Sequence, residues 1–176
     1  MGSSCTTEEL LQIIKSRRAV RQYKEGEILE EGIQKILEAA IWAPTGSNIQ
    51  PWEFIVVKEK RNLKALKMVV PGLFGNPSLV VILCINLKRA EKGGKLGELS
   101  ALMDISMSAQ NMMLMAHTMG IGSCPVLSFS EPALRQLFRI PPHIKPVLLL
   151  SFGYPKIVPS PPPRRPLNEV VHYEGY

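Results

Sequence analysis

Three arginines fall within five residues near the start of the chain, at Arg17, Arg18 and Arg21. A guanidinium group binds phosphate oxygens through two parallel hydrogen bonds, so this run suits a phosphate ligand. The run also follows a predicted helix, and cations at a helix C-terminus complement the helix dipole without any ligand. Taken alone, the arginines are compatible with a phosphate site or with a solvated helix end.

A second polar segment, APTGSNIQPWEF at residues 43–54, lies between a predicted helix and a predicted strand. It offers hydroxyl, amide and backbone groups at nearly every position, and Pro44 and Pro51 stiffen it. Such a loop suits a planar ligand with many hydrogen-bonding edges. A late basic pair, Arg164 and Arg165, stands between two prolines. This pair is either a further ligand contact or an exposed charged segment.

Several other chemistries lack their signatures in this sequence. No G-x-G-x-x-G follows a strand, and there is no P-loop and no G-x-S-x-G. The histidines and the cysteines are widely spaced, which predicts neither a metal site nor disulfides. They are His117, His143 and His172, and Cys5, Cys84 and Cys124. Unpaired cysteines predict reduced thiols in a cytoplasmic protein.

The composition bounds the class of protein. With 176 residues, 45% of them hydrophobic, the chain predicts one globular domain over residues 1–176. The net charge of +6 fits nucleic acid or small anions such as phosphates. The basic residues are scattered and not interleaved with aromatics, which favours small anions over nucleic acid. No run is apolar enough to cross a membrane, and no secretory segment opens the chain.

The opening residues 1–6 match a myristoylation pattern, but this pattern is short and often matches by chance. Further along, mixed helical and strand patterns without strict alternation predict an α+β fold. Helices are expected at about 7–17, 33–41, 60–70, 98–119 and 131–138, strands at 54–57, 79–86 and 146–155, an extended segment at 120–126, and exposed loops at 71–77 and 88–97.

Two segments suggest contact with another surface. The predicted helix at 98–119 is apolar on most of its circumference, so either a second subunit or its own chain must enclose it. The proline-rich tail from 155 to 176 is either a loose end or an extended arm laid over another surface. Residues 167–173 of this tail alternate enough to predict a strand that pairs with a partner's sheet.

Taken together and in order, five segments resemble the nitroreductase family of flavoproteins. They are SRRAVR at 16–21, APTGSNIQPWEF at 43–54, GIGSC at 120–124, GYP at 153–155 and PRRPL at 163–167. The resemblance implies an α+β fold with a mixed, mainly antiparallel sheet flanked by helices. It also implies FMN held without a covalent bond at the interface of an intertwined homodimer, with exchanged C-terminal arms.

The resemblance assigns roles by position. Arg17 and Arg18 match phosphate ligands, with the backbone of Ala19 beside them, where the family often has serine. One of Arg164 and Arg165 is expected to complete the phosphate site. Arg21 matches a basic residue near the N1–C2 carbonyl edge of the flavin. The expected ring contacts are Pro44, Thr45, Gly46 and Asn48 from the other subunit, with Gly46 in place of a common serine, and Pro125, Val126 and Leu127 near N5.

The implied activity is an FMN-dependent oxidoreductase. It passes a hydride from NADH or NADPH through flavin N5 to a small-molecule acceptor, a nitroaromatic, quinone or similar compound, with ping-pong kinetics. No side chain is required as acid or base, and no metal is expected. Alternatives are a non-catalytic FMN-binding sensor or storage protein, and a divergent branch of the family that dehalogenates or destroys flavin. The absence of a long insertion between residues 86 and 98 favours a broad reductase.

Overall fold

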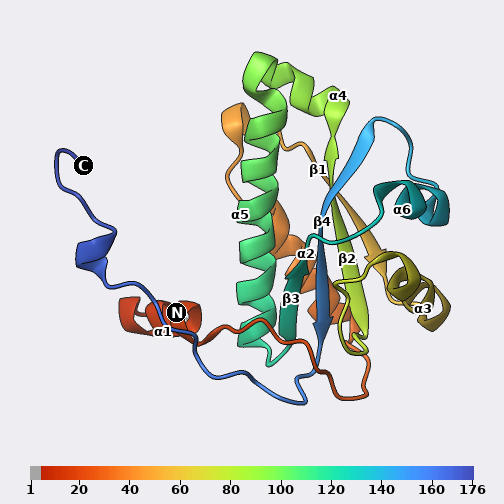
Figure 1. Cartoon of the computed structure of the whole chain (residues 1–176), viewed down its shortest axis with the longest axis horizontal. Coiled ribbons are helices and arrows are strands. Elements are labelled where there is room, and N and C mark those ends of the chain that lie inside the picture. Colours follow the sequence, from red (N-terminus) through yellow and green to blue (C-terminus); the bar gives the residue numbers. More distant parts are fainter. Residues whose placement is uncertain (1–4) are drawn as a thin grey trace.

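A four-stranded sheet in the order β1-β2-β4-β3 forms the centre of the computed structural model, which describes residues 5–176 (Figure 1). The strands are β1 (Trp52–Val57), β2 (Leu79–Asn86), β3 (Gly122–Val126) and β4 (Ile144–Gly153). All three pairings between these strands are antiparallel. The helices and 3-10 turns are α1 (Thr7–Ser16), α2 (Glu30–Ile41), η1 (Gly46–Asn48), α3 (Lys60–Val69), α4 (Leu87–Ala90), η2 (Glu91–Leu96), α5 (Gly97–Thr118), α6 (Glu131–Phe138) and η3 (Leu167–Glu169). The prediction of an α+β fold is confirmed.

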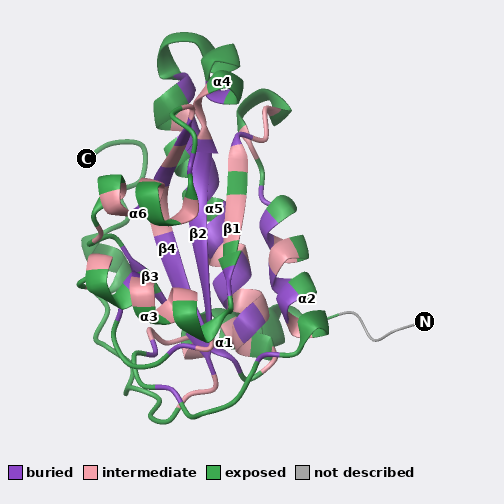
Figure 2. Cartoon of the chain, turned by 90° about the vertical axis from the view of Figure 1, so that its right-hand side faces the viewer, coloured by how far each residue is buried: buried purple, intermediate pink, exposed green. Residues whose placement is uncertain are grey.

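Strand β2 is buried on both faces because helices cover both sides of the sheet (Figure 2). Its continuous apolar run alternates between two cores, as the period of two requires. Val81 and Leu83 join the core formed with α2 and α5, whereas Val80 and Ile82 join the core formed with α3 and α6. The rigid sheet therefore fixes the strand ends on which the neighbouring loops are mounted.

Helix α5 is enclosed by its own chain on one side only. Ala101, Ile105 and Met112 are buried against the sheet and α2. A second set of apolar side chains on the same helix is 39–57% exposed. These residues, called the α5 stripe below, are Leu99, Leu102, Met103 and Met107. The alternative that its own chain encloses the helix therefore holds for one side only.

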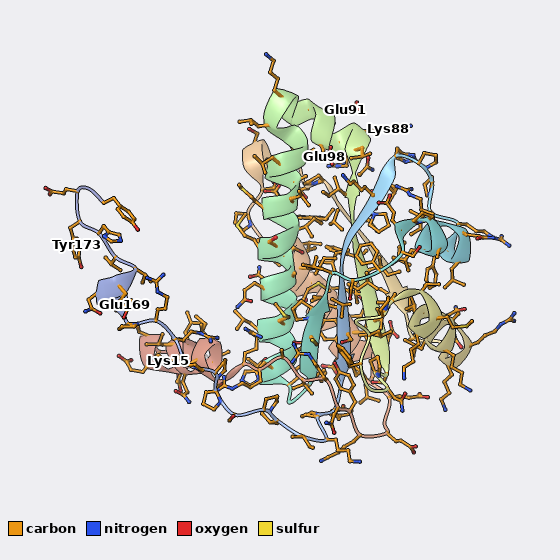
Figure 3. All side chains as sticks on the ribbon, viewed as in Figure 1. Lys15, Lys88, Glu91, Glu98, Glu169 and Tyr173 are labelled. Carbon is orange, nitrogen blue, oxygen red and sulfur yellow. The ribbon has the colours of Figure 1, made fainter. Side chains whose placement is uncertain are left out.

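Both ends of the chain project from the body on the same side (Figure 1). Helix α1, predicted at about 7–17, starts with a capping box between Thr6 and Glu9 but buries no residue. Residues 156–176 are exposed throughout, and Glu169 and Tyr173 lie beyond α1, away from the sheet (Figure 3). The predicted strand at 167–173 is absent, and η3 stands there instead, because no strand edge lies beside it.

Two further predictions from the sequence need comment. The basic segment 88–97 is exposed apart from Ala90 and Gly97, but it forms α4 and η2 where a loop was expected. Asn86 caps α4 by accepting a hydrogen bond from the Arg89 amide, which starts the helical turn. The myristoylation-like pattern rests on residues 1–4, which lie outside the described part of the chain.

Candidate functional site

The arginine turn, residues 17–21, runs alongside strand β3. The Val20 amide donates to the Ser123 carbonyl at 2.9 Å, and Ala19 forms a parallel bridge to Ser123. This close approach requires glycine at position 122, because a Cβ there would lie 2.7 Å from the Val20 Cβ. The arginine turn is therefore held against the sheet by backbone contacts.

A buried hydrogen-bond network links the arginine turn to strands β3 and β4. The Tyr23 hydroxyl donates to the Val20 carbonyl at 2.6 Å and lies 2.9 Å from the Ser151 Oγ. Ser151 Oγ in turn donates to the Cys124 carbonyl at 3.2 Å. Burial raises the pKa of Tyr23 well above its ordinary value, so the hydroxyl stays a neutral donor. Sequence reasoning did not identify Tyr23 or Ser151, which are far apart along the chain.

Arg17 carries the feature that points most directly to a bound anion. Its Nε atom is buried and has no hydrogen-bond partner among the described residues. A buried cationic N–H without a partner is costly, and a phosphate oxygen would satisfy it. Arg18 lies beside it and donates to the Lys15 and Arg17 carbonyls at 2.7 and 2.8 Å. The residues present therefore fit the phosphate of a cofactor such as FMN.

The pKa of His117 is affected by the positive charges of these arginines. Its Nε2 lies 2.7 Å from the Ser16 Oγ, so the ring is held by a hydrogen bond to the end of α1. Burial lowers the pKa of His117, and the charges of Arg17 and Arg18 lower it further. The imidazole is thus kept neutral beside these two arginines, so it adds no charge to the site.

The loop at residues 71–77 forms a further wall beside the arginine turn. A Cβ at Gly75 would clash with the Arg21 carbonyl, and a Cβ at Gly72 would clash with Ser128. Gly75 also has a φ of +66°, which favours glycine. The sequence analysis assigned no role to this loop, although its two closely spaced glycines were a signal of close backbone approach.

The predicted ring segment 125–127 leaves the sheet beside this wall. Val126 is buried in the core, whereas Pro125 is exposed and Leu127 is 75% exposed. Burial raises the pKa of the neighbouring Cys124 thiol, and the charges of Arg21 and Arg17 oppose that rise. Arg21 and Arg17 therefore lie near the start of this segment. Within the predicted trio, only Pro125 and Leu127 present their side chains to solvent.

The polar loop at 44–50 holds a strained backbone. Ser47, Asn48 and Gln50 have φ angles of 50°, 54° and 52°. Each left-handed residue other than glycine costs on the order of 1 kcal/mol or more, and such strain is found where a loop has a function. Thr45 supports the turn by accepting from the Gln50 amide at 3.2 Å. The strain supports a binding role for this segment.

Two anchors fix the polar loop to the body. The Gly46 amide donates to Asp104 Oδ1 on α5 at 3.3 Å, and Asp104 is only 3% exposed. Arg89 donates to the Ile49 and Gln50 carbonyls, both at 2.9 Å. Burial raises the pKa of Asp104, and the hydrogen bond from Gly46 partly opposes the rise. The anchors come from distant parts of the sequence and were not predicted.

The two predicted halves of the site lie at opposite ends of α5 (Figure 1). The arginine turn meets the helix near His117, and the polar loop meets it at Asp104. These positions are thirteen residues apart, which is about 20 Å of helix at 1.5 Å per residue. One chain therefore does not bring the two halves together, and a site containing both needs two chains.

The late basic pair lies on the exposed arm. Arg164 donates to the Pro163 carbonyl at 3.2 Å, and Arg165 pairs with Glu169 at 3.3 Å. Within the described residues, no hydrogen bond joins either arginine to Arg17 or Arg18. In the same part of the chain, no group of metal-binding side chains and no helix capable of spanning a membrane is found.

Comparison with known proteins agrees with this geometry. Residues 14–77 and 66–154 match the model of the nitroreductase family. A protein of Archaeoglobus fulgidus, provisionally named NADH dehydrogenase/NAD(P)H nitroreductase, is 36% identical over 85% of this chain and 87% of its own length. The FMN reductase (NADPH) of Bacillus subtilis is 27% identical over 94% of this chain and 74% of its own length.

The solved structures lead to the same family. The crystal structure of a nitroreductase family protein from Clostridium difficile 630 has a TM-score of 0.82 and 30% identity, and it covers 94% of this chain and 98% of that one. The fold is thus that of the nitroreductase family, and the resemblance seen in the sequence is confirmed. The chain belongs to the nitroreductase family.

Proposed function

We propose that this protein is an NAD(P)H-dependent oxidoreductase that uses FMN as its cofactor. The observation that carries the proposal is the buried, unpartnered Nε of Arg17 at the turn where the family motif stands. The relatives named NAD(P)H nitroreductase, FMN reductase and Cr(VI) reductase support the reductase class. When bound, FMN supplies the redox chemistry by accepting two electrons from NADH or NADPH and passing them to a second substrate.

In this reaction the protein would bind the cofactor, orient its ring and place charge beside it. Arg17 and Arg18 would hold the phosphate, with Ala19 contributing only its backbone. Arg21 would place a fixed positive charge at one edge of the ring. Pro125 and Leu127 would lie along the ring. No described residue needs to transfer a proton, since the acceptor can take its proton from water.

The complete site is proposed to form between two copies of the chain. The polar loop, with Pro44, Thr45, Gly46 and Asn48, would frame the ring bound by the arginine turn of the partner. The exposed α5 stripe supports this arrangement, because apolar side chains on a central helix are usually covered. The arm would cross to the partner, where either Arg164 or Arg165 would complete the phosphate site.

The acceptor is proposed to be a small molecule such as a nitroaromatic or quinone. Between β2 and α5 the chain has only the short turns α4 and η2, so no long lid restricts access from this segment. The relatives that share the fold carry names with several different acceptors, which supports a broad specificity.

The visible spectrum of the purified protein, followed by anaerobic titration with NADH and NADPH, tests the proposal. We expect bound FMN, bleaching by at least one nicotinamide, and recovery of colour when a nitroaromatic or quinone is added. A yellow protein inert to both nicotinamides would indicate a binding or storage protein. A chain that cannot be loaded with FMN would refute the cofactor assignment.

A further inference from the structure

A separate cavity of about 630 Å³ lies between residues 24–27, helix α3 and the segment leading into β2. Its lining includes five lysines and two glutamates, a formal excess of three positive charges. The lysines are Lys24, Lys58, Lys60, Lys64 and Lys67. This cavity is called the lysine pocket below. Its volume falls within the range typical of sites for nucleotide-sized ligands, whereas a single small ion would fill little of it.

Most of this positive charge has no carboxylate partner. Among the described residues, only Lys58 of the five forms an ion pair, with Glu30 at 2.8 Å. Lys67 donates to the neutral side chain of Asn76. Lys60 and Lys64 stand four residues apart on α3, a spacing at which two like charges on a helix repel each other. An anion in the pocket would relieve this repulsion.

The start of α3 adds to the positive potential. Its N-cap residue, Glu59, makes no side-chain capping bond, and the first turn carries Lys60 and no acidic residue. Lys60 therefore opposes the helix dipole at this end of α3, whereas the carboxylate of Glu59 complements it. Together with the hollow shape, this charge favours a ligand with several negative charges.

The pocket adjoins the arginine turn through two short connections. Gly75 packs against the Arg21 carbonyl, and the next residue, Asn76, lines the pocket. Lys24 lies three residues after Arg21, a span of at most about 10 Å of extended chain. A ligand with one end beside Arg21 and phosphates further along its length would bring those phosphates toward the lysines.

We propose that the lysine pocket binds the diphosphate of the nicotinamide co-substrate, an inference that rests on the proposed function. The dinucleotide carries a planar ring at one end and its phosphates several bonds away, as this placement requires. Lysine binds phosphate as a point charge and does not need a fixed fork geometry. The pocket thereby separates co-substrate binding from cofactor binding, since different cations serve the two sets of phosphates.

The test compares two double variants that lose equal charge. Lys60→Gln with Lys64→Gln empties the pocket of two cations. Lys88→Gln with Lys92→Gln is the matched control, because Lys88 on α4 and Lys92 on η2 do not line the pocket. Figure 3 shows Lys88 at the end of the sheet away from Lys15 on α1. Both are prepared with FMN bound, so that the arginine turn is occupied. Pyrophosphate affinity is measured by calorimetry, and the KM for NADPH and inhibition by pyrophosphate are measured in parallel.

We expect the pocket variant to bind pyrophosphate about tenfold more weakly and to raise the KM for NADPH by a similar factor. The control should change neither, and pyrophosphate should compete with NADPH in the wild-type protein. Equal pyrophosphate affinity in both variants and the wild type would overturn the anion site.

Weakened pyrophosphate binding without competition, and with an unchanged KM, would assign the pocket to a free phosphate anion and overturn the co-substrate assignment. A chain that binds no FMN and oxidises no NADPH would instead remove the proposed function, and the co-substrate assignment with it. The pyrophosphate titration of the two variants would still decide whether the pocket binds anions, so the two failures are distinguishable.

Discussion

At the scale of single residues, Arg17 is the side chain on which phosphate binding should depend most. Arg17→Ala should weaken FMN binding by about 10-fold to 100-fold, because charge-assisted hydrogen bonds contribute roughly 1.5–3 kcal/mol. The FMN affinity of Arg17→Lys should lie between those of the wild type and Arg17→Ala, because lysine keeps the positive charge and loses the paired hydrogen bonds of the guanidinium group. FMN dissociation constants measured by fluorescence would check this. The exposed Arg61→Ala is the control, and equal losses in both variants would contradict the assignment.

Arg21 is expected to act on the potential of the cofactor more than on its affinity. A fixed positive charge at the ring edge stabilises the reduced, negatively charged form of the flavin, so Arg21→Ala should lower the FMN reduction potential. A shift on the order of 30 mV would correspond to about 1.4 kcal/mol for a two-electron couple. Spectroelectrochemical titration measures it directly. A potential equal to that of the wild type would remove Arg21 from the ring edge.

Asp104 makes a prediction about pH. Because burial raises its pKa in the folded chain, the folded state holds this proton more tightly than the unfolded state does. The resulting stability is present at acid pH and lost as the pH rises through the folded pKa. Asp104→Asn keeps an oxygen that can accept from the Gly46 amide. Because asparagine does not ionise, this variant does not lose stability as the pH rises through the pKa of Asp104. Its free energy of unfolding, relative to wild type, should therefore increase between about pH 4 and about pH 7.

Urea unfolding at the two pH values would measure this difference for Asp104→Asn. Asp104→Ala, which leaves the Gly46 amide without its acceptor, should be about 1 kcal/mol less stable than Asp104→Asn at either pH and should loosen the polar loop. Parallel pH profiles for the wild type and Asp104→Asn would show that the carboxyl is not perturbed by burial.

Residue types predicted part of the site and missed the rest for a physical reason. Arg17 and the polar loop are visible in the sequence because charge and hydrogen-bonding capacity are concentrated locally. Asp104 and Tyr23 are invisible there, because their partners lie 58 and 128 residues away along the chain. A lone acidic residue on a helix, or a lone tyrosine, gives no local signal of such a contact.

At the scale of elements, the α5 stripe makes the clearest prediction. Met103 is 57% exposed in one chain, so Met103→Glu should leave the fold of a single chain intact. If a second copy covers the stripe, the buried charge should abolish the dimer and with it the FMN site. Light scattering gives the mass of the assembly, and circular dichroism reports the fold.

Met68→Glu is the matched control for this experiment, because Met68 on α3 is 87% exposed and lies outside the stripe. It should change neither mass nor FMN content. A Met103→Glu protein with the same mass as the wild type would mean that the stripe is not the interface.

The elements also show which sequence signals carry structural information. The helices predicted at about 7–17 and 33–41 agree with α1 and α2 to within a few residues, because a capping box at Thr6 and periodic apolar residues are local signals. The conformations predicted for residues 88–97 and 167–173 were wrong for two different reasons. Glycine and lysine content predicts exposure, not conformation, and an alternating pattern becomes a strand only where a strand edge is available.

At the scale of the whole molecule, three features of the single chain lack a partner surface. The arginine turn and the polar loop occupy opposite ends of α5, the α5 stripe is open, and the arm buries nothing (Figures 1 and 2). A symmetric dimer would resolve all three features, because a two-fold axis places one end of a helix beside the opposite end of its partner. The central claim is that FMN binds between two chains.

Subunit complementation tests that claim most directly. Arg17→Ala removes the phosphate ligand of the arginine turn, and Gly46→Val places a bulky side chain in the polar loop, where the Cβ alone would displace the Ser100 Oγ at 2.7 Å. Each variant alone should bind FMN poorly. When the two are unfolded together and refolded, half of the dimers should be mixed, each with one intact site. FMN binding should then recover to about a quarter of the wild-type capacity, with wild-type affinity. If the mixture bound no more FMN than its two components refolded separately, each site would lie within one chain and the account would be contradicted.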